Sequence, residues 1–246
     1  MKTKKSFIRT VFSYFLHFLF PKTCLACGCD LDAQTQHSLC SCCLAALRPP
    51  GPLICRRCGA VLKSGGAHCY ACRGTKAKKY KCSVIRSAFV FNDSSRAWIH
   101  ALKYGGADYL GKEMGKEMSL RFCRYPELSE AELIIPVPLF SKKYRQRGYN
   151  QSELLARSFS AELSLPLDKN SLKRIRHTVS QTTLGRKERL ENMAGAFVCI
   201  NPKAVYRKTI LLIDDVATTG ATLEGCAQAL KQAGAKKVLA YTFARE

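Results

Sequence analysis

The sequence predicts an α/β fold in which an open, largely parallel sheet follows a cysteine-rich, metal-binding region. Three observations lead to this prediction. Strand-like and helix-like segments alternate from residue 83 onward, and four C-x-x-C pairs fall within residues 24–72. Two adjacent aspartates, Asp214 and Asp215, follow a buried apolar run and precede a threonine-rich turn. Alternating strands and helices are typical of parallel sheets with helices on their faces.

The chain of 246 residues is long enough for one or two domains. It carries 40 Lys and Arg against 18 Asp and Glu, a formal net charge of +22. The imbalance is strongest in residues 1–84, whose only acids are Asp30 and Asp32. Such a basic region indicates a polyanionic partner such as nucleic acid, because cationic surface gains affinity by releasing phosphate counterions. A surface that is basic for solubility alone is the alternative.

The first 22 residues imitate a signal peptide, with a basic start and then an aromatic and aliphatic run. Arg9 and His17 interrupt this run, and it is shorter than the ~20 apolar residues that span a bilayer. We therefore expect residues 1–22 to form an amphipathic helix that caps the following domain. No transmembrane segment is expected, and peripheral membrane contact is the alternative. The expected location is cytoplasmic, where clustered cysteines are more often metal ligands than disulfides.

The cysteine pairs form a duplicated unit. Residues 24–31 (CLACGCDL) and 55–62 (CRRCGAVL) share the pattern C-x-x-C-G-x-x-L, and a second pair follows each, within CSCC at 40–43 and CYAC at 69–72. Cysteines three apart can place both sulfurs on one side of a tight turn, and two such turns complete a tetrahedral Zn²⁺ site. A site closed by four thiolates is structural, and the metal would supply most of the folding energy of so small a module.

Residues 23–81 are therefore expected to form a double zinc ribbon that ends in a basic linker. Sequential pairing is favoured because it closes the shorter loops, while interleaved pairing remains an alternative and iron–sulfur ligation is a weaker competitor. The expected ligands of the two structural Zn²⁺ sites are Cys24, Cys27, Cys40 and Cys43 for the first, and Cys55, Cys58, Cys69 and Cys72 for the second.

The segments after the linker are expected to form a second domain, residues 82–246. The serines that open the helical pattern at 94–104 suit an N-cap. In open parallel sheets ligands bind beyond the carboxyl ends of the strands, which is where the two aspartates fall. The expected strands are 83–91, 133–138, 209–215 and 237–244, and the expected helices are 94–104, 150–163 and 221–234.

The turn after the acidic pair, residues 218–222, runs directly into a helix. It would present unpaired N–H groups, hydroxyl donors and the positive end of the helix dipole to a phosphate. Carboxylates would repel that phosphate, so we expect them to accept hydrogen bonds from hydroxyls, or to engage Mg²⁺, a short distance away. A sugar 5-phosphate meets both demands. The Gly-x-x-x-x-Gly-Lys-Ser/Thr and three-glycine phosphate loops are absent from the sequence. A solvated strand end with a helix cap is the remaining alternative.

Residues 211–222 (LLIDDVATTGAT) resemble the phosphoribosyl pyrophosphate signature of type I phosphoribosyltransferases. Three more segments, in order and spacing behind the cysteine-rich region, make nearly the whole chain similar to the ComF family of DNA-uptake proteins (ComFC and GntX-like proteins). The resemblance implies a type I phosphoribosyltransferase-like open parallel sheet with an N-terminal double zinc ribbon, acting in natural transformation. The three segments are IHALKYGG (99–106), IIPVPLFSKKYRQRGYNQSELLA (134–156) and RHTVSQTTLGRKERLENMAGAF (176–197).

Carried over motif by motif, the resemblance assigns the acidic pair to the ribose 2- and 3-hydroxyls and the turn to the 5-phosphate. Lys103, Tyr104 and Gly105 match the short loop after the first helix that contacts pyrophosphate. Arg186, Lys187 and Arg189 match a mobile segment that would close over the pyrophosphate and neutralise its charge; a solvated helical face is the alternative for these basic residues. Ala217 departs from the bulkier residue expected there. The expected ligand-binding residues are Asp214, Asp215, Ala217, Thr218, Thr219, Gly220, Ala221 and Thr222.

These assignments leave two possible functions. One is a phosphoribosyltransferase that uses phosphoribosyl pyrophosphate with Mg²⁺ and an unknown acceptor. The other is a non-enzymatic adaptor that binds single-stranded DNA and uses the pocket for ligand sensing. Residues 142–151 (KKYRQRGYNQ) interleave cations with aromatics, which suits single-stranded nucleic acid, although they could equally line the active-site entrance. DNA-uptake helicases or recombination proteins are the protein partners that the resemblance implies.

Overall fold

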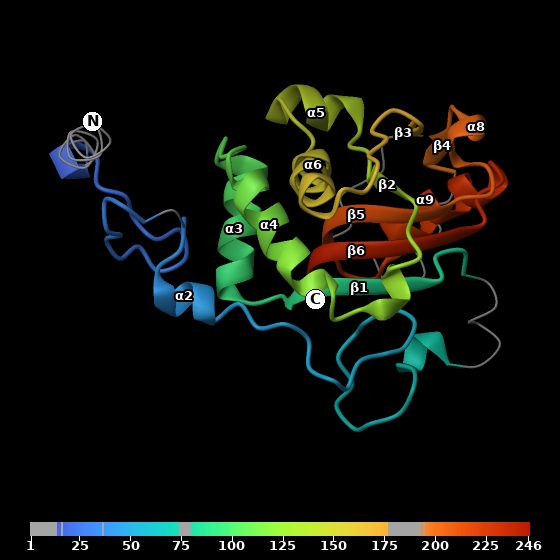
Figure 1. Ribbon diagram of the computed structural model, residues 1–246, viewed down its shortest axis with the longest axis horizontal. Helices are drawn as coiled ribbons and strands as arrows, with labels where there is room; N and C mark the ends of the chain where they lie inside the picture. The colour runs from blue at the N-terminus through green and yellow to red at the C-terminus, as the bar shows by residue number, and fades with distance from the viewer. Residues whose placement is uncertain (1–13, 16, 36, 74–79, 177–192, 194) are drawn as a thin grey trace.

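The computed structural model describes residues 14–15, 17–35, 37–73, 80–176, 193 and 195–246. At its centre is a four-stranded sheet, parallel throughout, in the order β1-β6-β5-β2 (Figure 1). The expectation of an open parallel sheet is confirmed, and each expected strand coincides with one of the four apart from small shifts at its ends. The strands are β1 (Val84–Val90), β2 (Leu133–Pro136), β5 (Thr209–Ala217) and β6 (Lys237–Arg245).

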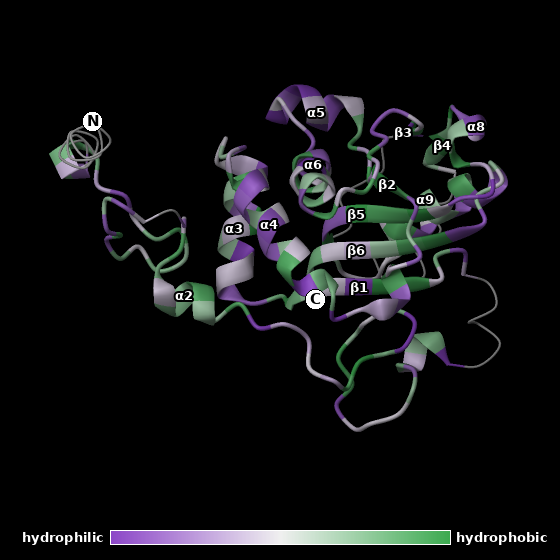
Figure 2. Cartoon of the chain, in the orientation of Figure 1, coloured by the Kyte–Doolittle hydropathy of each residue, from purple (hydrophilic) through white to green (hydrophobic). Residues whose placement is uncertain are grey.

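Strand β5 sends apolar side chains to both faces of the sheet, and Figure 2 shows the resulting hydrophobic centre. Leu211 and Ile213 belong to one buried cluster, whereas Ile210 and Leu212 belong to a second. Strands buried on both faces read as continuous apolar runs, which explains why this segment of the sequence lacks the alternation of a half-exposed strand.

Helices cover both faces of this sheet. Trp98, Met114 and Phe159 bring α3, α4 and α6 into the first cluster, while Leu223 and Leu230 bring α9 into the second. The sequence predicts α3, α6 and α9, but it does not predict α4 or α5. The helix bounds are α3 (Asp93–Tyr104), α4 (Leu110–Phe122), α5 (Ser141–Arg147), α6 (Gln151–Leu163) and α9 (Ala221–Gln232).

Helix α3 begins earlier than the serines suggest. The side chain of Asn92 accepts a hydrogen bond from the backbone N–H of Ser95 at 3.0 Å, and the Ser95 hydroxyl accepts one from the backbone N–H of Asn92 at 2.8 Å. These reciprocal bonds form a capping box. The serine-rich stretch therefore marks the helix start, but the capping residue is the preceding asparagine.

A small antiparallel pair, β3 (Leu172–Arg174) with β4 (Phe197–Cys199), packs against α9 and is not predicted by the sequence. Each of its strands is only three residues long, too short for a pattern of alternation to stand out. The remaining short elements are α2 (Ser41–Ala45), η1 (Tyr70–Cys72), η3 (Pro126–Leu128) and α8 (Pro202–Val205).

The two cysteine modules repeat the same local hairpin. A β-bridge joins Thr23 to Asp30 in the first module and Ile54 to Val61 in the second, at equivalent positions of the sequence repeat. In Figure 1 the first module lies beyond α3 and α4, and the second lies alongside the edge strand β1. A covered edge cannot pair with another chain, so the second module also protects the sheet.

The described part of the N-terminal segment does not bury its aromatic side chains. Residues 14–15 and 17–19 are helical, and Phe18 and Phe20 are 83% and 75% exposed. These side chains therefore do not cap the following domain, and the rest of the predicted helix over 1–22 lies outside the described residues. Among the helices that are described, none has the length and apolar character needed to cross a membrane.

Candidate functional site at the carboxyl edge of the sheet

Asp214 and Asp215 lie inside the second half of β5 rather than beyond its end. The strand continues to Ala217, and Asp214 pairs with Thr242 of β6 in register. Both carboxylates are buried, with 7% and 3% of their residue surface exposed. Charged groups are almost never buried to this extent unless they have partners.

The partners of the acidic pair come from two helices. In the first turn of α6, the Ser152 hydroxyl donates to Asp214 Oδ1 at 2.7 Å and the Gln151 amide donates to Asp215 Oδ1 at 3.4 Å. At the end of α3, Lys103 forms an ion pair with Asp215 Oδ2. The start of α6 and the end of α3 therefore meet at the same edge of the sheet and define the orientation of both carboxylates.

The two carboxylates titrate differently because only one has a cation. Burial and the neighbouring Asp215 carboxylate raise the pKa of Asp214 to about 8. Burial acts against ionisation of Asp215 as well, but the charge of Lys103 and the hydrogen bonds that Asp215 makes together outweigh burial and hold the pKa of Asp215 below its usual value. The pair therefore carries one negative charge near neutral pH, balanced by Lys103.

This asymmetry predicts a pH dependence of stability. Asp214 binds a proton in the folded state up to about pH 8, but its unfolded-state pKa is close to 3.8. The unfolded state is therefore favoured as pH rises between these values. An Asp214→Asn variant should gain stability relative to wild type from pH 5 to pH 8, by up to about 4 kcal/mol at about 1.36 kcal/mol per pH unit. Urea unfolding of both proteins across that range measures this gain. A difference in the free energy of unfolding that stays constant with pH would contradict the raised pKa of Asp214.

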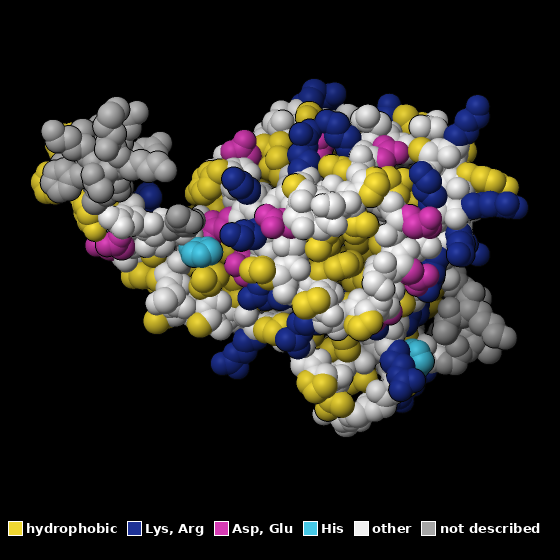
Figure 3. Space-filling view, viewed as in Figure 1, with side chains coloured by type: hydrophobic (Ala, Val, Ile, Leu, Met, Phe, Trp, Pro, Cys, Tyr) yellow, Lys and Arg dark blue, Asp and Glu magenta, His cyan; other side chains and the backbone are white. Residues whose placement is uncertain are grey.

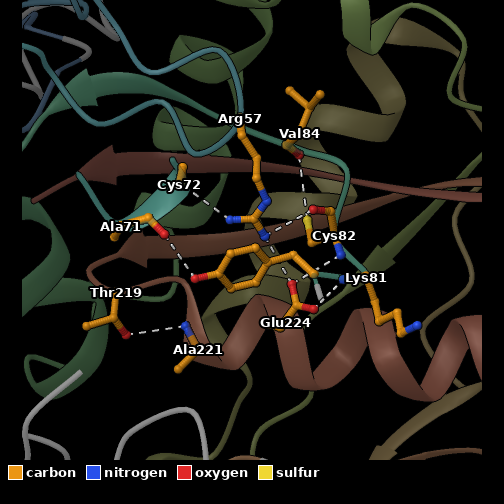
Figure 4. Close-up of polar contacts among 10 residues, drawn as sticks. Arg57, Ala71, Cys72, Lys81, Cys82, Val84, Thr219, Ala221 and Glu224 are labelled. Atoms are coloured by element: carbon orange, nitrogen blue, oxygen red, sulfur yellow. Dashed lines mark hydrogen bonds and ion pairs between the residues drawn. The ribbon is translucent and has the colours of Figure 1, made fainter. Parts of the chain in front are cut away.

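The predicted phosphate-binding turn, residues 218–222, begins helix α9. Gly220 is the N-cap, with a left-handed φ of 79°, and being glycine it has no side chain to accept a hydrogen bond from the first turn. The hydroxyl of Thr219 accepts a hydrogen bond from the backbone N–H of Ala221 at 3.3 Å (Figure 4). Other N–H groups of the first turn have no partner within the helix, as is general at helix N-termini. This geometry suits an anion.

A cavity of about 420 Å³ joins the turn to the acidic pair. Both carboxylates line it, together with Thr218 and Thr222 of the turn and with Lys103 and Tyr104 of α3. The intervening residues 219–221 shape the turn without lining the cavity. Ala217 does not line it either: its side chain is buried, and Val216 occupies the wall.

Five cations line the same cavity. Four of them lie close together: Lys103, Lys143 and Arg147 come from α3 and α5, and Arg174 comes from β3. The fifth, Arg96 of α3, pairs with the exposed Asp93. Burial and the charges of Arg174, Arg147 and Lys103 lower the pKa of Lys143. Like charges held this close are unfavourable unless an anion joins them, so the cavity is suited to a multiply charged anion. Arg174 has no distinguishing sequence signal, because only the pairing of β3 with β4 brings it to the site.

The three basic residues of the predicted mobile segment, Arg186, Lys187 and Arg189, lie outside the described residues. Their predicted role therefore remains a prediction. The cations described above come from other parts of the chain and already surround the cavity.

The eight cysteines of the two modules form two separate clusters, grouped sequentially rather than interleaved. Within each cluster the four sulfurs lie within 4.8 Å of one another. A tetrahedral site with Zn–S near 2.3 Å would separate its sulfurs by about 3.8 Å. The sulfurs of Cys27 and Cys40 are 3.8 Å apart, and those of Cys58 and Cys69 are 3.6 Å apart. Both clusters therefore fit Zn²⁺, as a double zinc ribbon requires.

Comparison with known proteins agrees with this division. Residues 15–73 match the model of a double zinc ribbon domain, and residues 150–246 match that of a phosphoribosyl transferase domain. The chain is 28% identical over 226 residues to "Competence protein F" of Haemophilus influenzae, covering 90% of this chain and 96% of that protein. It is 27% identical over 228 residues to "DNA utilization protein YhgH" of Escherichia coli K12, covering 92% and 97%.

A third relative and a solved structure complete the comparison. "Competence protein ComFC" of Streptococcus pneumoniae is 28% identical over 234 residues, covering 90% of this chain and 99% of that protein. The glutamine phosphoribosylpyrophosphate amidotransferase of Bacillus subtilis superimposes with a TM-score of 0.35 at 19% identity. The match covers 53% of this chain and 25% of that one.

Proposed function

Because this chain is a homologue of the ComF-type competence and DNA-utilization proteins, with a double zinc ribbon and a phosphoribosyltransferase domain, we propose that it binds phosphoribosyl pyrophosphate with Mg²⁺. The proposal rests above all on the cavity at the carboxyl edge of the sheet. Two buried carboxylates, a helix N-terminus and five cations line it. A ligand with a diol between a phosphate and a pyrophosphate matches that order of groups.

Each part of the ligand has a proposed partner. The turn at 218–222 binds the 5-phosphate through backbone N–H groups and threonine hydroxyls. Asp214 and Asp215 accept hydrogen bonds from the ribose hydroxyls. The pyrophosphate lies against Lys103 and the cations of α5 and β3. Mg²⁺ enters with the pyrophosphate and neutralises part of its charge.

Calorimetry tests this proposal directly. Titration of phosphoribosyl pyrophosphate with Mg²⁺ into the folded, zinc-loaded protein should give saturable heat with one site per chain, because the chain has one such cavity among the described residues. Ribose 5-phosphate should bind more weakly, since it lacks the pyrophosphate that the four cations lying close together would hold. Absence of saturable heat from folded, zinc-loaded protein would overturn the assignment of the pocket.

Turnover is a separate part of the proposal. If the protein is an enzyme, a nucleophile displaces pyrophosphate at the anomeric carbon, and the site acts by positioning and by stabilising the leaving charge. Pyrophosphate release with nucleobase, nucleotide or DNA acceptors would identify a transferase. Binding without release would identify an adaptor that senses the ligand.

We also propose that single-stranded DNA binds beside this cavity, at α5. Lys103, Tyr104, Lys143 and Arg147 line the first cavity and also a neighbouring one of about 410 Å³. Tyr104 is 71% exposed, and the guanidinium of Arg147 lies 5.4 Å from the centre of its ring. Exposed rings stack bases and nearby cations bind phosphates. Figure 3 shows Lys and Arg side chains gathered over α5.

The basic residues of α5 fall into two groups, one that lines the entrance of the site and one that faces solvent. Lys143 and Arg147 line the cavities, so they belong to the entrance of the site. Lys142 and Arg145 are exposed and do not line either cavity, so they remain available to a bound strand. The two readings of this segment are therefore compatible.

The salt dependence of DNA binding tests whether the solvent-facing cations of α5 contact the phosphates of the bound strand. A Lys142→Gln/Arg145→Gln variant should bind a single-stranded oligonucleotide more weakly, and the slope of log K against log salt should fall by about 1.4, at about 0.7 per lost phosphate contact. The control is Lys203→Gln/Lys236→Gln, which removes the same charge near the starts of β5 and β6, at the opposite edge of the sheet. Fluorescence anisotropy measures both. Equal slopes in the two variants, or affinity insensitive to salt, would contradict this placement.

A further inference from the structure

Glu224, in the first turn of α9, joins this helix to the second zinc ribbon (Figure 4). Its carboxylate accepts hydrogen bonds from the backbone N–H groups of Lys81 and Cys82, the latter at 3.1 Å. It also forms an ion pair with Arg57 at 3.2 Å. The two side chains of this ion pair are 12% and 15% exposed, so the link is largely shielded from solvent.

Arg57 lies inside the first C-x-x-C turn of the second ribbon and reaches the metal cluster itself. Its Nη1 donates to the sulfur of Cys72 at 3.5 Å, and its Nη2 donates to the carbonyl of Cys82 at 3.3 Å (Figure 4). Its guanidinium lies 3.4 Å from the centre of the Tyr80 ring. A planar guanidinium that is stacked on one face and bonded along its edge has little freedom, so it transmits position between its partners.

A second contact runs through the edge strand β1. The backbone N–H of Ile85 donates to the carbonyl of Arg57 at 2.7 Å. The side chain of Ile85 lies against the turn, because a Cβ at Gly220 would be only 3.1 Å from its Cδ1. The second ribbon thus supports the turn at 218–222 from two sides, through β1 and through α9.

The first ribbon is anchored in a similar way but to a different helix. Glu113 of α4 accepts hydrogen bonds from the backbone N–H of Ser38 at 2.9 Å and from its hydroxyl at 2.8 Å, and it lies 3.0 Å from His37. Helix α4 contributes no side chain to the lining of the 420 Å³ cavity. Each ribbon is therefore bonded to a helix carboxylate, Glu113 of α4 for the first ribbon and Glu224 of α9 for the second. Only α9 begins at the site.

We propose that the second zinc ribbon positions the phosphate-binding turn through Arg57 and Glu224, and that the first ribbon does not. This inference rests on the proposed function, which places the 5-phosphate at that turn. Arg57 and Glu224 are positioning residues. A turn already held in the binding conformation avoids an ordering cost when the phosphate arrives, so losing the link lowers affinity without removing any ligand contact.

The test compares matched carboxylate variants of the full-length, zinc-loaded protein. Glu224→Gln removes the charge that binds Arg57 but keeps one oxygen, which can still accept one of the two backbone N–H bonds. Glu113→Gln makes the same change at the first ribbon. We expect Glu224→Gln and Arg57→Gln to weaken the binding of phosphoribosyl pyrophosphate with Mg²⁺ about tenfold, and Glu113→Gln to leave the affinity unchanged. Both zinc ions should remain bound in every variant, as metal analysis will show.

Hydrogen exchange supplies a readout that does not depend on the ligand. Amides of residues 220–226 should exchange faster in Glu224→Gln and Arg57→Gln than in wild type, and at the wild-type rate in Glu113→Gln. Wild-type exchange at 220–226 in the second-ribbon variants, or equal affinities in all three variants, would overturn the inference. If wild type itself fails to bind, the proposed function fails, and the exchange rates still decide whether the ribbon holds the turn.

Discussion

Replacing Asp215 by asparagine should weaken the binding of phosphoribosyl pyrophosphate about a hundredfold at pH 7, whereas Asp214→Asn should weaken it by about tenfold or less. Asp215 is the carboxylate that Lys103 keeps ionised. Its loss removes a charged acceptor for the ribose and also leaves Lys103 without its counterion. A hydrogen bond to a charged group contributes about 1.5–3 kcal/mol, and an unpaired buried charge adds to the cost.

Asp214 should be more tolerant, because burial and its neighbour already favour its protonated form near neutral pH. Asparagine resembles that neutral carboxyl and can still accept the hydrogen bond from the Ser152 hydroxyl through its amide oxygen. Calorimetry measures both variants, with Glu130→Gln as a control, since Glu130 pairs with Lys237 at the start of β6, at the opposite edge of the sheet. Equal losses at Asp214 and Asp215 would show that Lys103 does not distinguish them.

Gly59→Ala should destabilise the protein much more than Gly28→Ala, although the two glycines occupy the same position of the repeat. Both have left-handed φ, 68° and 74°, so each substitution incurs a backbone cost of about 1–2 kcal/mol. A Cβ at Gly28 would meet nothing within 4 Å, whereas one at Gly59 would lie 2.7 Å from the carbonyl oxygen of Ile85. That atom is backbone of strand β1 and cannot move without shifting the strand.

We expect Gly59→Ala to cost about 2–3 kcal/mol more than Gly28→Ala, because relieving the overlap of the new Cβ with the Ile85 carbonyl strains the contact between the second ribbon and β1. At about 2–4 °C per kcal/mol for a chain of this size, the melting temperatures should differ by roughly 5–10 °C. Thermal unfolding of the zinc-loaded variants, with wild type alongside, measures the difference. Similar melting temperatures would mean that the second ribbon does not pack against β1 as closely as described.

Much of the fold could be predicted because its signals are local. The strand around Ile213 is a continuous apolar run, and in the structure the side chain of Asn150 caps the helix predicted over 150–163. Helix α4 was not predicted even though Leu110, Met114 and Met118 recur at helical spacing and are fully buried. Its lysines and glutamates make the segment polar on average, and its buried stripe becomes evident only where α4 packs against α6 and the sheet.

The sequence by itself determined which chemistry two stretches of this chain are suited to. Cysteines three apart followed by glycine indicate a thiolate metal site, and a strand, two acids and a hydroxyl-rich turn predict an anion-and-diol site. Both are contiguous along the chain, so the geometry of a few backbone units is enough to indicate their chemistry.

Only the tertiary structure decided which distant residues join those sites. Arg174 reaches the cavity because β3 pairs with β4, and Lys103 meets Asp215 because α3 ends where β5 does. Arg57 and Glu224 are 167 residues apart in sequence, and no local pattern relates them. Strand order brings the second ribbon alongside β1 and next to α9, so two modules that are nearly equivalent in sequence occupy different environments. Convergence of this kind depends on how the sheet is ordered and how its helices cross over, which short-range spacing does not encode.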